Sequence, residues 1–172
     1  FVIAAIAIVI LVTAFFYFSA LNRQSQTTKP QTPQTSETKS QTTSQALQGY
    51  SGILLAGHAS PFLEFNKADY EKALSEGKII FLDFYANWCP ICRAEEPILK
   101  AAFNELNSDQ VIGFRVNYND DQTDADEKAL AKQFNITYQH TKVILKNGQE
   151  FSKSLEPWDQ QKFDQGINKA IE

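Results

Sequence analysis

The chain has 172 residues, two cysteines and a formal net charge of −4, from 16 basic and 20 acidic side chains. This mildly acidic balance gives no electrostatic reason to expect a nucleic-acid partner. Beyond the first 48 residues, about 120 remain, which is enough for one domain with its own core. The chain begins with Phe1 and contains no Met, so we expect further residues to precede it.

Residues 1–21 form a nearly unbroken apolar run, in which only Thr13, Tyr17 and Ser19 are polar. At a rise of ~1.5 Å per residue, a helix of this length spans roughly the 30 Å hydrocarbon core of a bilayer. A cleavable signal peptide is the alternative, but its apolar region is usually shorter, and Phe18 fits poorly into a small-residue cleavage motif. We therefore expect a single-pass transmembrane anchor.

Residues 22–48 are almost all Gln, Thr, Ser, Pro and Lys. Such a segment cannot bury enough apolar surface to offset the entropy lost on ordering it. We predict a disordered linker that gives a folded domain, residues 49–172, reach from the membrane. Because the anchor is N-terminal and a polar linker follows it, we expect this domain on the extracytoplasmic side.

Caps and apolar runs place the first elements of the domain. Asn66 is a good N-cap and Gly77 a good helix end, so a helix is expected between them. The run 78–85 is rich in Ile, Phe and Leu, as expected of a strand buried on both faces. In chain order we predict a strand at 61–65, the helix that Asn66 caps, the strand 78–85, a helix from the cysteines to Leu106 that contains Pro97, and a strand at 111–118.

The acidic segment 120–127 precedes the next predicted helix, which continues through Phe134. The segment lacks the glycine and the ligand spacing of a calcium-binding loop. We interpret it instead as a helix start, with Thr123 and Asp126 as its capping box.

Turn signals define the end of the chain. Asn147-Gly148 between strands at 141–146 and 150–155 is a strong hairpin signal. Pro157 is predicted to open a final helix, because proline is favoured in the first helical turn. The side chains that this helix should bury are Phe163, Ile167 and Ile171. The predicted order is β-α-β-α-β-α-β-β-α, an α/β arrangement around a central sheet.

The two cysteines, Cys89 and Cys92, follow the buried strand and are separated by Pro90 and Ile91. A thiol pair at this spacing forms and reopens a disulfide by exchange: the first thiolate attacks a partner's disulfide, and the second thiol releases the mixed intermediate. The free N–H groups of a helix N-terminus favour a thiolate placed there. We therefore expect Cys89 to be the exposed nucleophile and Cys92 to be the resolving thiol.

Two other roles for the cysteines are weaker. A structural disulfide this short constrains little chain, so stability is a poor reason for it. A zinc site needs two further ligands, and the only histidines are His58 and His140. His58 is interpreted as a loop residue without a role. Thiol exchange needs no cofactor, and none is expected.

Local features from residue 61 to the end resemble those of thioredoxins. The matching residues are Trp88 directly before the first cysteine, Asp83 on the strand beneath the site, the helix-kinking Pro97, and the hairpin Lys146-Asn147-Gly148. The segment 117–136 is similar to the C-terminal thioredoxin-like domain of membrane disulfide-interchange proteins. The resemblance implies a thioredoxin fold, with a central mixed sheet flanked by helices, and the activity of a thiol–disulfide oxidoreductase.

The resemblance also implies roles for single residues. Asp83, buried as in the family, would accept the proton of Cys92, and Trp88 would shield and shape the site. The alternative for Asp83 is a core carboxylate that pairs with Arg115 on the neighbouring strand. Glu95 and Glu96 are interpreted as part of a solvated helix face.

Two positions depart from the family pattern. Thioredoxins carry a cis-proline opposite the cysteines, and here Gln139-His140-Thr141 places His140 there. The resemblance implies that these three residues, together with Pro90, bind the substrate and shape the site. A glycine usual near the last strand is replaced within Leu155-Glu156-Pro157. His140 adds a titratable group that could complete a Cys89–Cys92–His140 site for copper or zinc.

The sequence thus predicts a membrane-tethered, extracytoplasmic thiol–disulfide oxidoreductase. We favour a reductase or an electron relay, although Pro90-Ile91 matches neither the Gly-Pro of thioredoxins nor the Pro-His of strong oxidants. Its expected partners are proteins with dithiols or disulfides, together with a redox partner protein. The alternative is a copper or zinc metallochaperone that uses Cys89, Cys92 and His140.

Overall fold

The computed structural model describes residues 49–172, and the predicted anchor and linker lie outside this part. The strands are β1 (Leu54–Ala56), β2 (Phe62–Glu64), β3 (Ile79–Tyr85), β4 (Val111–Asn117), β5 (Thr141–Lys146) and β6 (Gln149–Ser154). The helices are α2 (Lys67–Ser75), α3 (Pro90–Glu105), α4 (Ala125–Gln133) and α5 (Gln160–Ile171). Within residues 49–172, no helix has the length and apolar character needed to cross a membrane.

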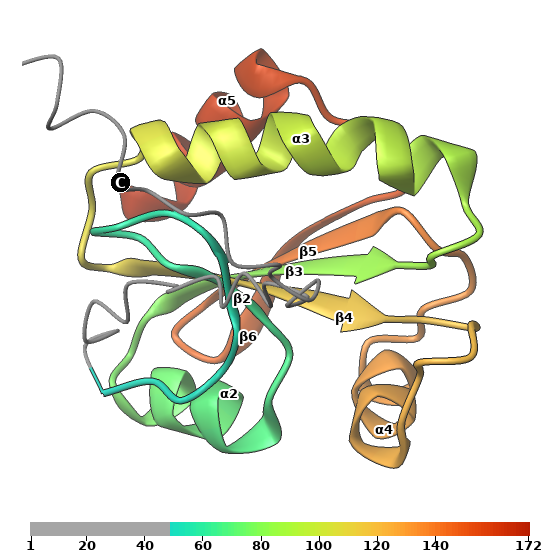
Figure 1. Ribbon diagram of the computed structural model, residues 1–172. Helices are drawn as coiled ribbons and strands as arrows, with labels where there is room; N and C mark the ends of the chain where they lie inside the picture. The colour runs from blue at the N-terminus through green and yellow to red at the C-terminus, as the bar shows by residue number, and fades with distance from the viewer. Residues whose placement is uncertain (1–48) are drawn as a thin grey trace, which may run out of the picture. The chain divides into compact units, whose positions relative to one another are not determined.

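The strands form one mixed sheet in the order β1-β2-β4-β3-β5-β6. β2 and β3 both run parallel to β4, whereas β5 is antiparallel to β3 and pairs with β6 through the predicted hairpin. Helices α3 and α5 cover one face of the sheet, and α2 and α4 cover the other (Figure 1). β3 is therefore central in the sheet and covered on both faces.

Alternation along β3 builds the two halves of the core. Ile80, Leu82 and Phe84 pack into the cluster beneath α2 and α4, while Ile79 and Phe81 join the cluster beneath α3 and α5. All seven residues of this strand are buried, which explains its unbroken apolar sequence. Asp83 is the one charged residue among them.

Close packing fixes α3 on the sheet. Phe103 of α3 stacks on Phe62 of β2 with ring centroids 4.7 Å apart. Gly113 of β4 lies directly below, and a Cβ atom there would stand 2.4 Å from the Phe103 ring. The glycine thus lets the helix approach the sheet closely enough to hold the cysteine turn against β3.

Four details correct the sequence predictions. The strand β1 was not predicted, because three residues carry too little periodicity to be recognised. The capping box of α4 is formed by Asp124 and Glu127, not by Thr123 and Asp126. Helix α5 begins after its N-cap Asp159 rather than at Pro157, and Ile171 is exposed because it lies in the last turn.

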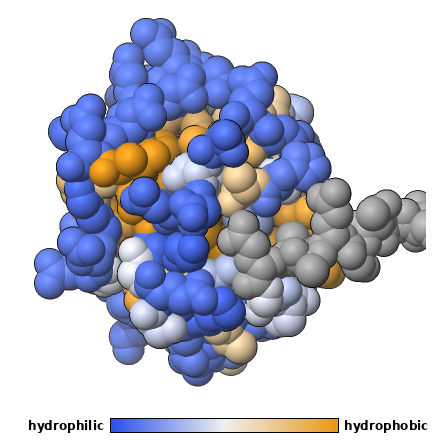
Figure 2. Space-filling view, turned by 90° about the vertical axis from the view of Figure 1, so that its left-hand side faces the viewer, coloured by the Kyte–Doolittle hydropathy of each residue, from blue (hydrophilic) through white to orange (hydrophobic). Residues whose placement is uncertain are grey.

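The end of the domain opposite the cysteine turn has a mainly hydrophilic surface. Figure 2 shows this end, with an apolar area that hydrophilic residues interrupt. The junction of β3 and α3 lies at the other end (Figure 1). The exposed apolar residues Trp88 and Ile91 belong to this junction.

Candidate active site

The two thiols lie where β3 ends and α3 begins. Cys89 is the N-cap of α3, with an extended backbone, and its Sγ accepts the Cys92 N–H at 3.2 Å. Pro90 follows as the first helical residue, where its missing N–H costs no hydrogen bond. Both thiols are free. The capping contact places the Cys89 sulfur in the field of the helix N-terminus.

Cys89 is buried, contrary to the sequence prediction of an exposed nucleophile. Only 1% of the residue is accessible, and it clusters with Tyr85, Ala86 and Cys92. The reason is local: the capping sulfur turns back towards the Cys92 N–H, and His140 lies against it, with Nδ1 at 4.0 Å from Sγ. A client disulfide therefore needs a small displacement of these neighbours to meet the sulfur.

Exposed side chains surround the buried thiols. Trp88 is 48% exposed and Ile91 is 41% exposed, and Pro90 lies between them on the surface. The Trp88 indole N–H donates to the Asn119 carbonyl at 2.9 Å, which fixes the ring against the loop after β4. The shaping role of Trp88 stays a prediction.

His140 lies opposite the thiols in the loop before β5. Its backbone has φ of 55°, a left-handed conformation that histidine adopts more readily than most residues. None of the peptide bonds in residues 49–172 is cis. The His140 N–H donates to the Phe84 carbonyl at 2.6 Å, and its own carbonyl accepts a hydrogen bond from Lys142 Nζ at 3.1 Å. The backbone N–H and the carbonyl of His140 therefore both have hydrogen-bond partners.

The neighbours of His140 have different surroundings. Thr141 is buried and its hydroxyl donates to the Tyr138 carbonyl at 2.7 Å, so it closes the loop rather than facing a client. Gln139 is half-buried beside it. Of the three residues predicted to shape this side of the site, His140 is the one whose side chain contacts a thiol, through Nδ1 and the Cys89 sulfur.

Asp83 is buried on β3, with 4% of its surface accessible. Burial raises its pKa from 3.8 to about 6, although the charges of Lys142 and Arg115 act in the opposite direction. In the sheet it stands between those two residues, Arg115 on β4 and Lys142 on β5. The alternative prediction, in which Asp83 pairs with Arg115, is wrong, because Arg115 forms its ion pairs with Glu64 and Glu96.

A buried ion pair beside the site was not predicted from the sequence. Glu95 of α3 is 4% exposed and pairs with Lys142, whose side chain is fully buried. Glu95 also accepts the Trp158 N–H. The prediction of a solvated Glu95 is wrong, because residue 95 lies one turn after Cys92 and one turn before Leu99, on the buried face of the helix. That spacing was the available signal.

Burial also affects the titration of two groups at the site. It raises the pKa of Cys92 well above that of an ordinary thiol, and the hydrogen bond with Cys89 acts in the same direction. Burial lowers the pKa of His140, with the Lys142 charge adding to the effect, so the imidazole is neutral at pH 7. Cys92 therefore keeps its proton at pH 7 while the site is reduced.

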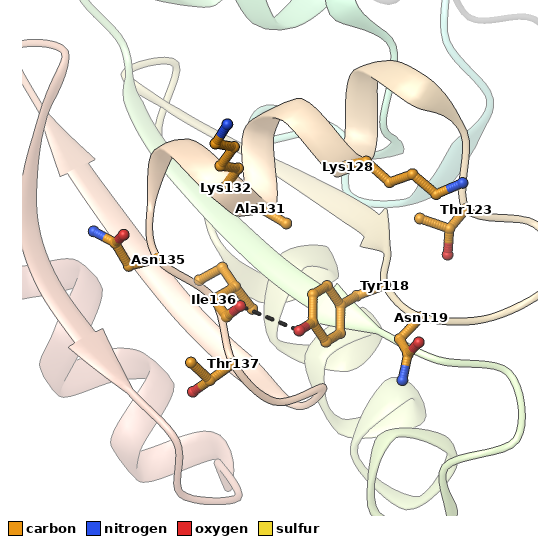
Figure 3. A pocket seen from close by; sticks show the side chains of 9 residues that line it. All are labelled: Tyr118, Asn119, Thr123, Lys128, Ala131, Lys132, Asn135, Ile136 and Thr137. Carbon is orange, nitrogen blue, oxygen red and sulfur yellow. Dashed lines mark hydrogen bonds between the residues drawn. The ribbon is translucent and has the colours of Figure 1, made fainter.

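A pocket of about 500 Å³ lies next to the site and was not anticipated from the sequence. It opens between the loop after β4, the helix α4 and the segment that leads to β5 (Figure 3). Tyr118 lines the pocket, and its hydroxyl donates to the Ile136 carbonyl at 3.1 Å. Asn119 connects the pocket with the thiol site: it lines the pocket, and its carbonyl accepts the indole N–H of Trp88, the residue before Cys89.

One set of metal-ligating atoms is present at the site. The sulfurs of Cys89 and Cys92 and a ring nitrogen of His140 all lie within 4.8 Å of one another. His58, the other histidine, is exposed in the loop after β1 and takes no part.

Residues 49–172 have the architecture of a thioredoxin fold: a mixed sheet covered by helices on both faces, with a Cys-x-x-Cys pair at the start of a helix. A protein-family model for thioredoxin matches residues 61–169. The chain therefore belongs to the thioredoxin family.

Individual relatives agree with this assignment. Thioredoxin from Mycoplasma genitalium is 32% identical over 85 residues, which cover 49% of this chain and 76% of that protein. Thioredoxin H2 from Arabidopsis thaliana is 29% identical over 87 residues, which cover 50% of this chain but only 59% of that protein. The crystal structure of Trxlp from Edwardsiella tarda superposes with a TM-score of 0.52 at 27% identity, covering 60% of this chain and 95% of that one.

Proposed function

We propose that this chain is a membrane-tethered, extracytoplasmic thiol–disulfide oxidoreductase that acts as a reductase or an electron relay through Cys89 and Cys92. The observation that carries the proposal is the reduced thiol pair at the N-terminus of α3, with the Cys89 sulfur capping the helix. The apolar run 1–21 and the polar linker after it are the support for the tether.

The proposed reaction has two exchanges. The Cys89 thiolate attacks a client's disulfide, forms a mixed disulfide and releases one client thiolate, which takes up a proton. Cys92 then attacks the Cys89 sulfur, which breaks the mixed disulfide and releases the second client thiolate. The client gains two electrons, and Cys89 and Cys92 become a disulfide. A redox partner protein with a dithiol returns the two electrons.

Asp83 would take the Cys92 proton in the second exchange. The raised pKa of Cys92 means that this thiol must lose a proton before it attacks. The Asp83 carboxylate, whose pKa is about 6, is ionised at pH 7 and is thus able to accept it. The burial of both groups keeps bulk water from competing for the proton.

Disulfide turnover tests the proposal. The full chain, in a mild detergent because of its apolar N-terminal run, is assayed for reduction of insulin disulfides. Cys89→Ser should abolish turnover, and Cys92→Ser should accumulate a mixed disulfide that a non-reducing gel resolves. Ser75→Ala, on the distant helix α2, is the control and should match the wild type. Full turnover in Cys89→Ser would overturn the assigned order of attack.

Sidedness needs a separate reporter, because both native thiols are buried. In a chain that carries Cys89→Ser and Cys92→Ser, the exposed Lys169→Cys provides the single reactive thiol. A membrane-impermeant maleimide applied to intact cells should label it. Labelling that appears only after cell lysis would contradict an extracytoplasmic domain.

A further inference from the structure

We propose that the reduced site binds one thiophilic cation, Cu(I) or Zn²⁺, through Cys89 Sγ, Cys92 Sγ and a ring nitrogen of His140. The three ligand atoms lie within 4.8 Å of one another, which a single ion bridges with small side-chain adjustments. Two thiolates and an imidazole form a soft donor set, which selects copper and zinc over magnesium or calcium.

The backbone around the ligands is already fixed. Cys89 and Cys92 are held one turn apart by the start of α3, where the Cys92 N–H caps onto the Cys89 sulfur. His140 is held by its N–H on the Phe84 carbonyl and by Lys142 on its own carbonyl. Binding therefore requires mainly side-chain rotations, and the entropy cost of ordering the site is small.

The residues around the site determine how many ligands the protein offers to the ion. Within residues 49–172, no fourth His, Cys, Asp or Glu joins the cluster. The thiols are buried and His140 is half-buried, and the protein leaves one coordination position of a four-coordinate ion open. Three protein ligands with one open position suit a trigonal Cu(I) or a Zn²⁺ that keeps a water, and they suit release of the ion to another molecule.

Metal binding and disulfide formation exclude each other. Binding requires both cysteines as thiolates, so any proton that a thiol still carries leaves as the ion enters, and no electrons move. Oxidation to the disulfide removes the two thiolates as ligands. The same dithiol thus either holds the cation or exchanges disulfides, and oxidation releases the ion. This inference depends on the reduced cysteines and His140 and does not require that the chain turn over any client.

Replacement of His140 separates a three-ligand site from binding by the thiols alone. His140→Asn removes the imidazole but keeps a residue that tolerates positive φ, so the loop is retained. The matched control is His58→Asn, in the exposed loop after β1. Circular dichroism on both variants checks that the fold is kept.

The full chain is reduced, kept anaerobic in detergent, and titrated with Cu(I) and separately with Zn²⁺ against a competing chelator. We expect one equivalent of at least one ion to bind to the wild type and to His58→Asn. His140→Asn should lose more affinity than the ~10–100-fold that removal of an outer-shell partner costs. In the zinc form, X-ray absorption should fit two sulfurs at ~2.3 Å and one protein nitrogen at ~2.0 Å.

Three results would overturn the site: no binding of either ion, equal affinity in His140→Asn and the wild type, or unchanged binding after oxidation to the disulfide. Insulin reduction is measured on the same metal-free wild-type sample. Loss of metal binding with intact turnover rejects only the metal site, and the reverse result rejects only the redox function.

Discussion

Two buried aspartates, Asp69 and Asp83, differ in their partners more than in their burial. Asp69 on α2 is 3% exposed and Asp83 on β3 is 4% exposed. The Asp69 carboxylate accepts the N–H of Ser51 at 3.0 Å and that of Gly52 at 2.6 Å, together with the Ser51 hydroxyl. Within residues 49–172, Asp83 has no such hydrogen bond, and the charges of Lys142 and Arg115 reach it only through space.

The contrast separates a structural carboxylate from one available for chemistry. Asp69 fastens the segment before β1 to α2, because its oxygens satisfy N–H groups that would otherwise lack partners. Asp83 keeps its acceptor capacity free beside a thiol that must lose a proton. Burial of a carboxylate is thus a poor marker of function unless its partners are counted.

The largest effect is expected from Lys142, the buried cation that lies opposite Asp83 on the neighbouring strand β5. Lys142→Ala leaves the Glu95 carboxylate buried without its counter-charge, and should lower the free energy of unfolding by about 3–5 kcal/mol in urea denaturation. The double variant Lys142→Met with Glu95→Leu removes both charges and should recover most of this loss.

A surface pair provides the control for Lys142. Lys67 pairs with Asp126, and both side chains are about half exposed. Lys67→Ala should leave the urea midpoint unchanged, because exposed ion pairs contribute little. If Lys142→Ala is as mild as Lys67→Ala, the buried pair does not hold the neighbourhood of Asp83 together, and the contrast with Asp69 weakens.

A smaller loss is expected at Asp69. Asp69→Ala removes the acceptor of two backbone N–H groups and should destabilise the domain by about 2 kcal/mol. Hydrogen exchange at Ser51 and Gly52 should accelerate in this variant, while disulfide turnover stays at the wild-type rate. Slowed turnover would mean that Asp69 influences the thiols and is not purely structural.

Local sequence signals predicted most of the elements that build this contrast. The N-cap Asn66, the buried strand ending at Tyr85 and the Asn147-Gly148 hairpin all lie where they were expected. These features depend on neighbouring residues, so the pattern of the sequence is sufficient. The cysteines at the start of α3 belong to the same group.

Long-range partners account for what the sequence did not reveal. The charge of Glu95 led to the prediction that it is solvated. Its burial depends instead on the ion pair with Lys142, 47 residues further along the chain. The strand β1 exists because it pairs with β2, not because of its own three residues. The left-handed backbone of His140 likewise accompanies a hydrogen bond to Phe84, which is far away in the sequence.

The smallest effect, and the one with the clearest sign, is expected at Asp83. Its pKa rises from 3.8 to about 6 on folding, so the ionised form is disfavoured in the folded state. The stability that Asp83 contributes is therefore present below pH 4 and is lost as the pH rises through about 6. At pH 8 this loss amounts to at most about 3 kcal/mol. A buried amide at the same place avoids this loss, but it has its own desolvation cost of about 1–3 kcal/mol.

Asp83→Asn should accordingly raise the free energy of unfolding by roughly 1 kcal/mol at pH 8 and bring no gain at pH 4. The same variant should slow disulfide turnover by ~10-fold or more, because Cys92 loses its proton acceptor. Urea denaturation at the two pH values and insulin reduction at pH 8 measure both effects. If the variant is more stable but slower than the wild type, the Asp83 carboxylate serves the reaction and lowers the stability of the fold. If Asp83→Asn destabilises equally at pH 4 and pH 8, Asp83 is a hydrogen-bonded structural residue like Asp69, and another group must take the Cys92 proton.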